Sequence, residues 1–238
     1  EPLAGAEFTV SPDPATPTDA DSSVTVTTGE ELFPDDLGQY DVAAPGLLVL
    51  FVFVNGLTGA YALIQTRQLG VSRRMMSTPT SMGTIITGEA YGRWLLSLFQ
   101  GAYILVATVL LFGMSWGDPL GAATVLVMVA AVAAGAAMVF GTLFSDPDQA
   151  SGIGVVVSLV LAALGGGMLP IELFSDTMAS IARITPHYWA IDAFAELVRH
   201  DATLLDILPQ LGVLAAMSAA LLAIAAWRMR VVLSRGGT

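Results

Sequence analysis

Five long stretches without a charged residue constrain the fold of this chain more than any other feature. They hold 21 to 27 residues each and cover 42–66, 94–117, 119–145, 149–171 and 207–227. Because an α-helix rises 1.5 Å per residue, about 20 apolar residues cross the hydrocarbon core of a bilayer. Hydrocarbon offers no partner to backbone polar groups, so long apolar segments must be helical. The sequence therefore predicts an all-α polytopic membrane protein with five spans, the first placed at 43–66.

The composition agrees with this class and excludes several kinds of chemistry. Of the 238 residues 55% are hydrophobic and only 12% charged, with a mean hydropathy of +0.72, whereas soluble domains carry about 25% charged residues. There is no cysteine, which excludes disulfides and thiolate metal sites. All nine basic residues are arginine, so neither a P-loop lysine nor a Schiff base can form. We expect no enzymatic activity, metal or cofactor on this chain itself. An acidic chain without lysine is typical of a haloarchaeon or a high-GC bacterium, which predicts a prokaryotic cell-membrane protein.

The first 42 residues differ from the rest, because they are polar and hold ten of the twenty acidic residues. They read as an external polar tail, the end of an extracytoplasmic domain, with one possible edge strand at SSVTVTT (22–28). The chain begins with Glu1, and no basic and apolar signal-peptide pattern follows. We therefore expect one further span upstream, which would give six in full.

The arginines orient the spans, because cytoplasmic segments near span ends are enriched in Arg and Lys. Four lie between the first and second spans and three follow the last one. This predicts a cytoplasmic loop at 67–93, a transmembrane domain over 43–235 and an external N-terminal tail. Only Arg183 and Arg199 would then lie outside.

The segment 172–206, between the last two spans, carries two short amphipathic patterns. In the first, Ser175 is a candidate N-cap, followed by Met178, Ile181 and Ala182 on one face. The second begins at Pro186, and its apolar face is Trp189, Ala193, Phe194 and Leu197. With their aromatic residues, these two helices are predicted to lie in the outer membrane interface or to dip into it.

Polar residues inside the spans are few, namely Asn55, Thr58, Gln100, Ser158 and Ser218, and Glu89 sits at the inner boundary. Such groups commonly hydrogen-bond between helices, at about 0.6 kcal/mol each. Alternatively Asn55, Thr58, Gln100 and Ser158 line a substrate path. No ionisable residue lies mid-span, so proton or sodium coupling has no visible carrier.

Small residues are frequent in the apolar segments and predict close helix packing. The glycines considered are Gly56, Gly88, Gly92, Gly135, Gly141, Gly152 and Gly154. The triple glycine 165–167 instead predicts a bent helix end.

The stretch TRQLGVSRRMMSTPTS (66–81) contains three arginines and directly follows the first span. Each arginine near anionic headgroups contributes about 1 kcal/mol. Pro79 should break the chain, Thr80 or Ser81 can cap, and MGTIITGEAYGR is then predicted to run helically into the second span. The broad basic face and interleaved aromatics of a nucleic-acid site are absent. Phosphorylation of STPTS stays open, although Ser, Thr and Pro also form ordinary turns.

GMSWG (113–117) matches the G-x-S-x-G pattern of serine hydrolases, which needs a strand before the serine and a base nearby. A spanning helix is predicted before Ser115, and both histidines, His187 and His200, lie in the external segment. Both observations argue against a serine hydrolase. An intramembrane hydrolase is therefore the least favoured hypothesis for this chain, and a fluorophosphonate probe against Ser115 tests it.

Three stretches, in this order, resemble the permease subunits of ABC type-2 transporters. They are APGLLVLFVFVNGLTGAYALIQTRQLGVSRRMMSTPTSMGTIITGEAYGR (44–93), GGGMLPIELF (165–174) and ITPHYWAIDAF (184–194). The resemblance covers 42–235 and departs from the family at Thr66, where a glutamate is common.

The resemblance implies a permease subunit that exports a substrate by alternating access and works as a homodimer or heterodimer. ATP and Mg would be bound by a separate ATP-binding cassette subunit. A coupling helix parallel to the membrane is implied in the loop 67–93, and the residues expected to bind the ATPase are Arg67, Arg73, Arg74, Met75, Thr78, Pro79 and Ser81. The alternative is a non-transporting assembly or scaffold protein whose external helices bind another protein.

Overall fold

The computed structural model describes residues 39–168, 171 and 174–235, all within the compact unit Asp36–Thr238. The tail and the strand predicted at 22–28 lie outside the described residues. Within the described ranges all regular secondary structure is helical, and five helical segments are long and apolar enough to cross a membrane. The predicted all-α fold with five spans is confirmed.

The first span consists of α1 (Gln39–Thr58) and α2 (Ala60–Gln68), separated only at Gly59. After α3 (Val71–Met76) comes α4 (Met82–Phe112), which includes the helical run predicted ahead of the second span and ends before the predicted 117. The early end has a local cause, because Gly113 adopts φ +66° and closes the helix in the left-handed region.

The third and fourth spans are α5 (Pro119–Leu143) and α6 (Pro147–Leu164). Both begin with an Asp-Pro pair, in which Asp118 or Asp146 caps the helix and proline takes its first position. Helix α6 stops short of the predicted 171, because the backbone turns at Gly166 (φ +89°) and the Gly167 N–H donates to the Ala162 carbonyl. The predicted bent helix end is therefore present.

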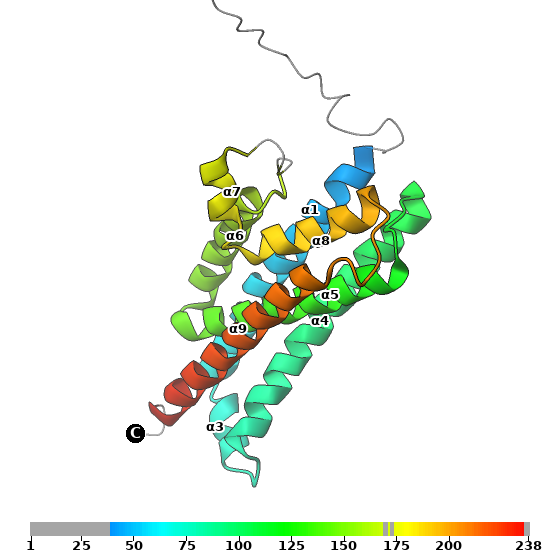
Figure 1. The fold of residues 1–238 in the computed structure, drawn as a ribbon. Helices are drawn as coiled ribbons and strands as arrows, with labels where there is room; N and C mark the ends of the chain where they lie inside the picture. Colours follow the sequence, from blue (N-terminus) through cyan, green and yellow to red (C-terminus); the bar gives the residue numbers. More distant parts are fainter. Residues whose placement is uncertain (1–38, 169–170, 172–173, 236–238) are drawn as a thin grey trace, which may run out of the picture. The chain divides into compact units, whose positions relative to one another are not determined.

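The last part of the chain forms α7 (Asp176–Ala182), α8 (Pro186–Arg199) and α9 (Leu208–Arg235), the fifth span. Ser175 caps α7 as predicted, and Thr185 caps α8 ahead of Pro186. Helix α8 crosses one end of the spans in Figure 1 and packs against α1, α5 and α9. Its buried face includes Ala193, Phe194 and Leu197 as predicted, whereas Trp189 is only half-buried. On α7, Ile181 is 44% exposed, so that predicted apolar face is only partly covered.

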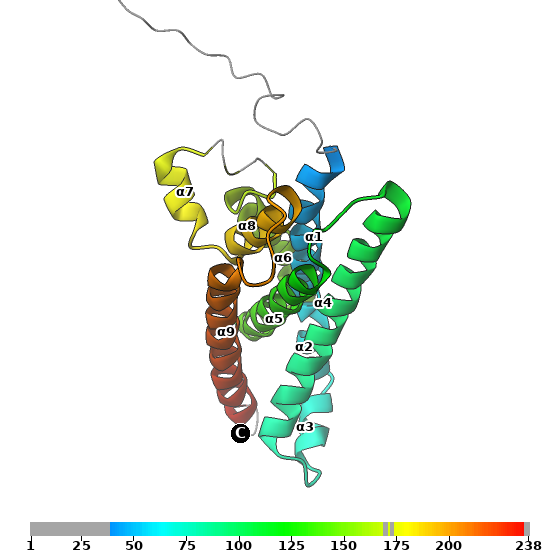
Figure 2. The ribbon, with the colours of Figure 1, turned by 45° about the vertical axis from the view of Figure 1, so that its right-hand side comes forward.

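Helix α5 is the most buried span and lies between α9 and α4 in Figure 2. Its glycines allow close contact, since a Cβ on Gly135 would overlap Leu221 of α9, and one on Gly141 would overlap Leu63 of α2. The packing prediction is wrong for three other glycines, because a Cβ there would meet no atom within 4 Å: Gly88, Gly92 and Gly152. All three positions are open among the described residues.

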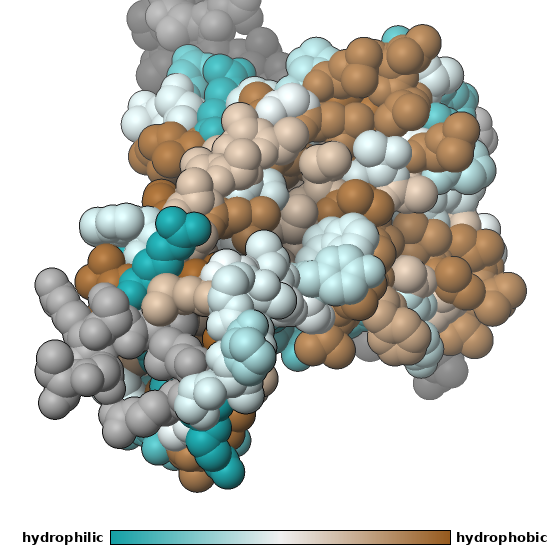
Figure 3. Space-filling view, turned by 90° about the horizontal axis from the view of Figure 1, so that it is seen from below, coloured by the Kyte–Doolittle hydropathy of each residue, from teal (hydrophilic) through white to brown (hydrophobic). Residues whose placement is uncertain are grey.

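We call the end of the spans at α3 and the C-terminal turns of α9 the inner end, and the end at α7 and α8 the outer end (Figure 1). Arg67, Arg93 and Arg228 contact the backbone of neighbouring helices at the inner end. Seen from that end, the surface in Figure 3 is broadly hydrophobic, with hydrophilic residues in separate patches. The cytoplasmic position of the inner end stays a prediction from the arginines.

Candidate functional site

The candidate coupling loop, residues 69–81, connects the first span to α4 through α3. The chain turns at Gly70 (φ +67°), and the turn after α3 is held by the Ser77 and Thr78 hydroxyls, which donate to the Arg74 and Met75 carbonyls at 2.7 and 2.6 Å. Ser81 then caps α4, its Oγ accepting from the Thr84 N–H at 3.1 Å. The sequence predicted this cap and the helix that follows it.

Most side chains predicted to bind an ATPase subunit lie on the surface of this loop. Arg74, Met75, Thr78, Pro79 and Ser81 are exposed. Arg73 belongs to α3, but its side chain is outside the described part of the chain. The described side chains of this loop therefore present the basic Arg74, the apolar Leu69 and Met75, and several hydroxyl groups at the inner end.

Arg67 is placed differently from the other predicted docking residues. It is partly buried, and its Nη2 donates to the Gly141 and Phe144 carbonyls, the latter at 3.0 Å. Arg228 of α9 reaches the same helix end, donating to Thr142 Oγ1 at 3.0 Å. The C-terminus of α5 carries partial negative charge and unpaired carbonyls, which these two guanidinium groups satisfy. Sequence reasoning assigned Arg67 to orientation and ATPase binding and Arg228 to orientation, and it missed this capping role.

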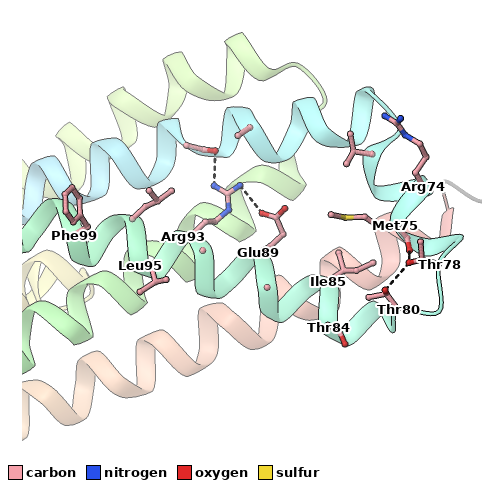
Figure 4. A pocket seen from close by; sticks show the side chains of 16 residues that line it. Arg74, Met75, Thr78, Thr80, Thr84, Ile85, Glu89, Arg93, Leu95 and Phe99 are labelled. Atoms are coloured by element: carbon pink, nitrogen blue, oxygen red, sulfur yellow. Dashed lines mark hydrogen bonds and ion pairs between the residues drawn. The ribbon is translucent and has the colours of Figure 1, made fainter.

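A third arginine, Arg93, connects α4 to the break between α1 and α2. Its Nη1 donates to the Gly59 carbonyl at 2.9 Å, and its Nη2 lies 3.6 Å from Glu89 Oε2 (Figure 4). Where the family commonly has a glutamate, Thr66 donates to the Leu63 carbonyl of its own helix. A carboxylate–arginine pair is thus present at the inner end, but both partners come from α4.

The second candidate site is a pair of amides halfway along the first two spans. The Asn55 Nδ2 donates to Gln100 Oε1 at 2.6 Å, and Gln100 Nε2 donates to the Phe51 carbonyl at 3.1 Å. Asn55 is exposed and Gln100 half-buried. Exposure of such amides to lipid would be unfavourable, so polar groups at this depth usually face protein or water.

The other two predicted path residues do not join this pair. Thr58 donates to the Val54 carbonyl at 2.7 Å, and Ser158 donates to the Gly154 carbonyl at 2.8 Å, each within its own helix. Ser158 is fully buried, so it lines no open path in this conformation.

Ser115 lies in the turn between α4 and α5, after a helix rather than a strand, and its Oγ accepts from the Gly117 N–H at 3.4 Å. His200 is exposed, and its Nδ1 lies 3.1 Å from Glu196 Oε2.

His187 is fully buried at the start of α8, with its ring centroid 4.2 Å from that of Phe53. Burial lowers the pKa of His187 to about 3. Among the described residues, no group of three or more His, Asp or Glu side chains is arranged to hold a metal.

Comparison with known proteins places the chain in a family. Residues 6–227 match the model of the family described as "ABC-2 family transporter protein". The chain is also 26% identical over 176 residues to the linearmycin resistance permease protein LnrN of Bacillus subtilis (strain 168). That similarity covers 74% of this chain and 46% of LnrN, so the chain spans about half the length of this relative. With five membrane-length helices and a family match over nearly its whole length, the chain belongs to the ABC-2 family of transporter proteins.

Proposed function

We propose that this chain is the transmembrane permease subunit of an ATP-driven ABC exporter. It moves a substrate outward by alternating access, as part of a dimer of permeases in the cell membrane. A separate ATP-binding cassette subunit binds ATP and Mg and hydrolyses the nucleotide. The ABC-2 family match and the permease name of LnrN support this assignment.

The observation that carries the proposal is the continuity between the exposed loop and a spanning helix. The loop ends at Ser81, and α4 then runs through 31 residues without interruption, about 46 Å at 1.5 Å per residue. A rigid helix of this length transmits a displacement at the inner end to the outer end. Exposed Arg74, Met75 and Thr78 provide the surface on which an ATPase subunit would push.

The amide pair supports the second half of the mechanism. Asn55 and Gln100 join α1 to α4, so a movement of α4 changes the position of polar groups in the middle of the membrane. We assign these two residues to the substrate path. The name of LnrN describes a resistance permease, which agrees with outward transport, and no substrate is assigned to this chain.

The docking claim is tested by co-purification of the full-length protein with its ATPase subunit. The double variant Arg73→Glu, Arg74→Glu should retain much less ATPase and lose transport. The matched control is Arg230→Glu, an exposed arginine of α9 at the same end, which should retain the ATPase. Unchanged co-purification and transport in the double variant would remove the basis for the docking surface.

The scaffold alternative relied on external helices that bind another protein. The burial of α8 against α1, α5, α6 and α9 weakens this alternative, because one face of the helix is already occupied within the subunit.

A further inference from the structure

A groove at the inner end lies between the candidate coupling loop and the first half of α4, and it extends beyond the surface assigned to ATPase docking. Its volume is about 1330 Å³, larger than the 300–1,000 Å³ of common small-molecule pockets. The stretch of α4 that lines it, Thr84 to Phe99, rises about 22 Å along the helix axis. One hydrocarbon leaflet is about 15 Å thick, so the groove is long enough to run from the headgroup level into the membrane.

The groove is amphipathic along its length. Figure 4 shows Leu95 and Phe99 at one end and Arg74, Thr78 and Thr80 at the other. Leu96 and Phe99 are 68% and 75% exposed, so the apolar end opens to the membrane. The polar end carries hydroxyl groups and the exposed Arg74.

The charges that line the groove sum to a net positive value. Arg74 and Arg93 stand against one carboxylate, Glu89, which is paired with Arg93. The Arg93 side chain is 11% exposed, and its buried Nε has no hydrogen-bond partner among the described residues. A basic pocket at the cytoplasmic ends of spans is the arrangement that binds anionic lipid headgroups.

Two glycines create the space. A Cβ placed on Gly88 or Gly92 would meet no atom within 4 Å, so this wall of the groove is bare helix backbone. Larger side chains would fill the groove without colliding with the rest of the subunit.

We propose that this groove binds one anionic phospholipid of the leaflet at the inner end. The phosphate lies at Arg74 and the neighbouring threonine hydroxyls, and an acyl chain runs along Leu95, Leu96 and Phe99. An apolar groove open to the bilayer is filled by acyl chains, and its positive end selects an anionic headgroup over a zwitterionic one.

The test is native mass spectrometry of the purified full-length permease, without its ATPase, in equal amounts of phosphatidylglycerol and phosphatidylcholine. The wild-type protein should retain one phosphatidylglycerol in preference to phosphatidylcholine. The variant Gly88→Leu, Gly92→Leu should lose this retained lipid. The control Gly152→Leu, Gly212→Leu, at two helical glycines whose Cβ positions are also open, should keep it.

A second pair of variants tests the headgroup without altering the groove wall. Arg74→Gln should reduce retention of phosphatidylglycerol but not of phosphatidylcholine, whereas Arg230→Gln should change neither. Equal retention of the two lipids by the wild-type protein would overturn the proposal. Unchanged retention of phosphatidylglycerol by the Gly88→Leu, Gly92→Leu variant would also overturn it. So would an equal loss of phosphatidylglycerol in this variant and in the Gly152→Leu, Gly212→Leu control.

The same variants separate this proposal from ATPase docking. If the Gly88→Leu, Gly92→Leu variant no longer co-purifies with the ATPase but still retains the lipid, the groove is a protein-binding site and the lipid proposal is wrong. Loss of lipid with normal co-purification supports the lipid site, whatever the outcome of the docking test.

Discussion

At the residue scale, the arginines of the inner end illustrate how one residue type serves two purposes. Positive charge near span ends fixes orientation, whichever arginine supplies it. Arg67 and Arg228 additionally cap the carbonyl end of α5, the helix at the centre of the packing. Arg230, two residues from Arg228, is exposed. Spacing along α9 decides which arginine reaches α5.

We therefore expect Arg228→Ala to destabilise the protein and Arg230→Ala to have little effect. Loss of the charged hydrogen bonds to Thr142 should cost about 1.5–3 kcal/mol. Thermal unfolding of the two variants in detergent, followed by circular dichroism, compares them directly. Equal melting temperatures would show that capping of α5 by Arg228 does not contribute to stability.

His187 provides a second prediction at this scale, through the pH dependence of stability. The folded protein holds the imidazole neutral with a pKa of about 3, whereas an unfolded chain titrates near 6.5. Below pH 6.5 the unfolded state binds more protons, so the free energy of unfolding decreases toward pH 3, by about 1.4 kcal/mol per pH unit. Above pH 6.5 this histidine adds no pH dependence.

Replacement of the titrating ring checks this assignment. His187→Phe should flatten the decrease in stability between pH 6.5 and 5, because a phenyl ring takes up no proton. His200→Gln, at an exposed histidine, is the control for removal of an imidazole elsewhere in the same segment. The measurement is the melting temperature of wild type and both variants across this pH range.

At the element scale, the turn between α4 and α5 determines how α8 packs. Gly117 adopts φ +68°, and a Cβ there would collide with the Leu197 carbonyl of α8. Gly113, four residues earlier, has nearly the same φ of +66°, but its Cβ position is open. Substitutions at these two glycines therefore distinguish the cost of backbone strain from the cost of losing the close contact between the turn and α8.

Gly113→Ala should destabilise the protein by about 1–2 kcal/mol, the cost of a left-handed conformation for a residue with a Cβ. Gly117→Ala should cost clearly more, because α8 must move away from the turn. Melting temperatures of the two variants test the difference. Similar losses at both positions would show that the close approach of α8 is not required.

At the scale of the whole described unit, the proposed substrate path predicts that the surface around the exposed Asn55 faces water rather than lipid. The chain has no cysteine, so single-cysteine variants can be labelled without background. Asn55→Cys should react readily with a maleimide in membranes, because a thiol on a water-filled path ionises and a thiol in lipid does not. Val156→Cys, at a residue of α6 that is 58% exposed, should react much more slowly. Equal reactivity would exclude a path at Asn55.

Local sequence signals predicted much of the architecture. Charge-free windows gave the number of spans, and the caps at Ser81 and Ser175 marked the starts of α4 and α7. Helix ends were predicted less well, because a left-handed glycine such as Gly113 can end an apolar helix before its hydropathy falls. The glycines of α4 were assigned to packing, although periodicity shows which residues share a face and not whether a helix covers it.

The sequence by itself determined that this chain crosses a membrane as helices, because exposing unpaired backbone groups to hydrocarbon is costly. The placement of the arginines predicts how these helices are oriented. Only the tertiary structure decided which polar groups meet. Asn55 and Gln100 are 45 residues apart, and Arg228 and Thr142 are 86 apart, yet each pair is within hydrogen-bonding distance. Such contacts depend on the rotation and neighbours of each helix, which arise from the packing of all five spans together.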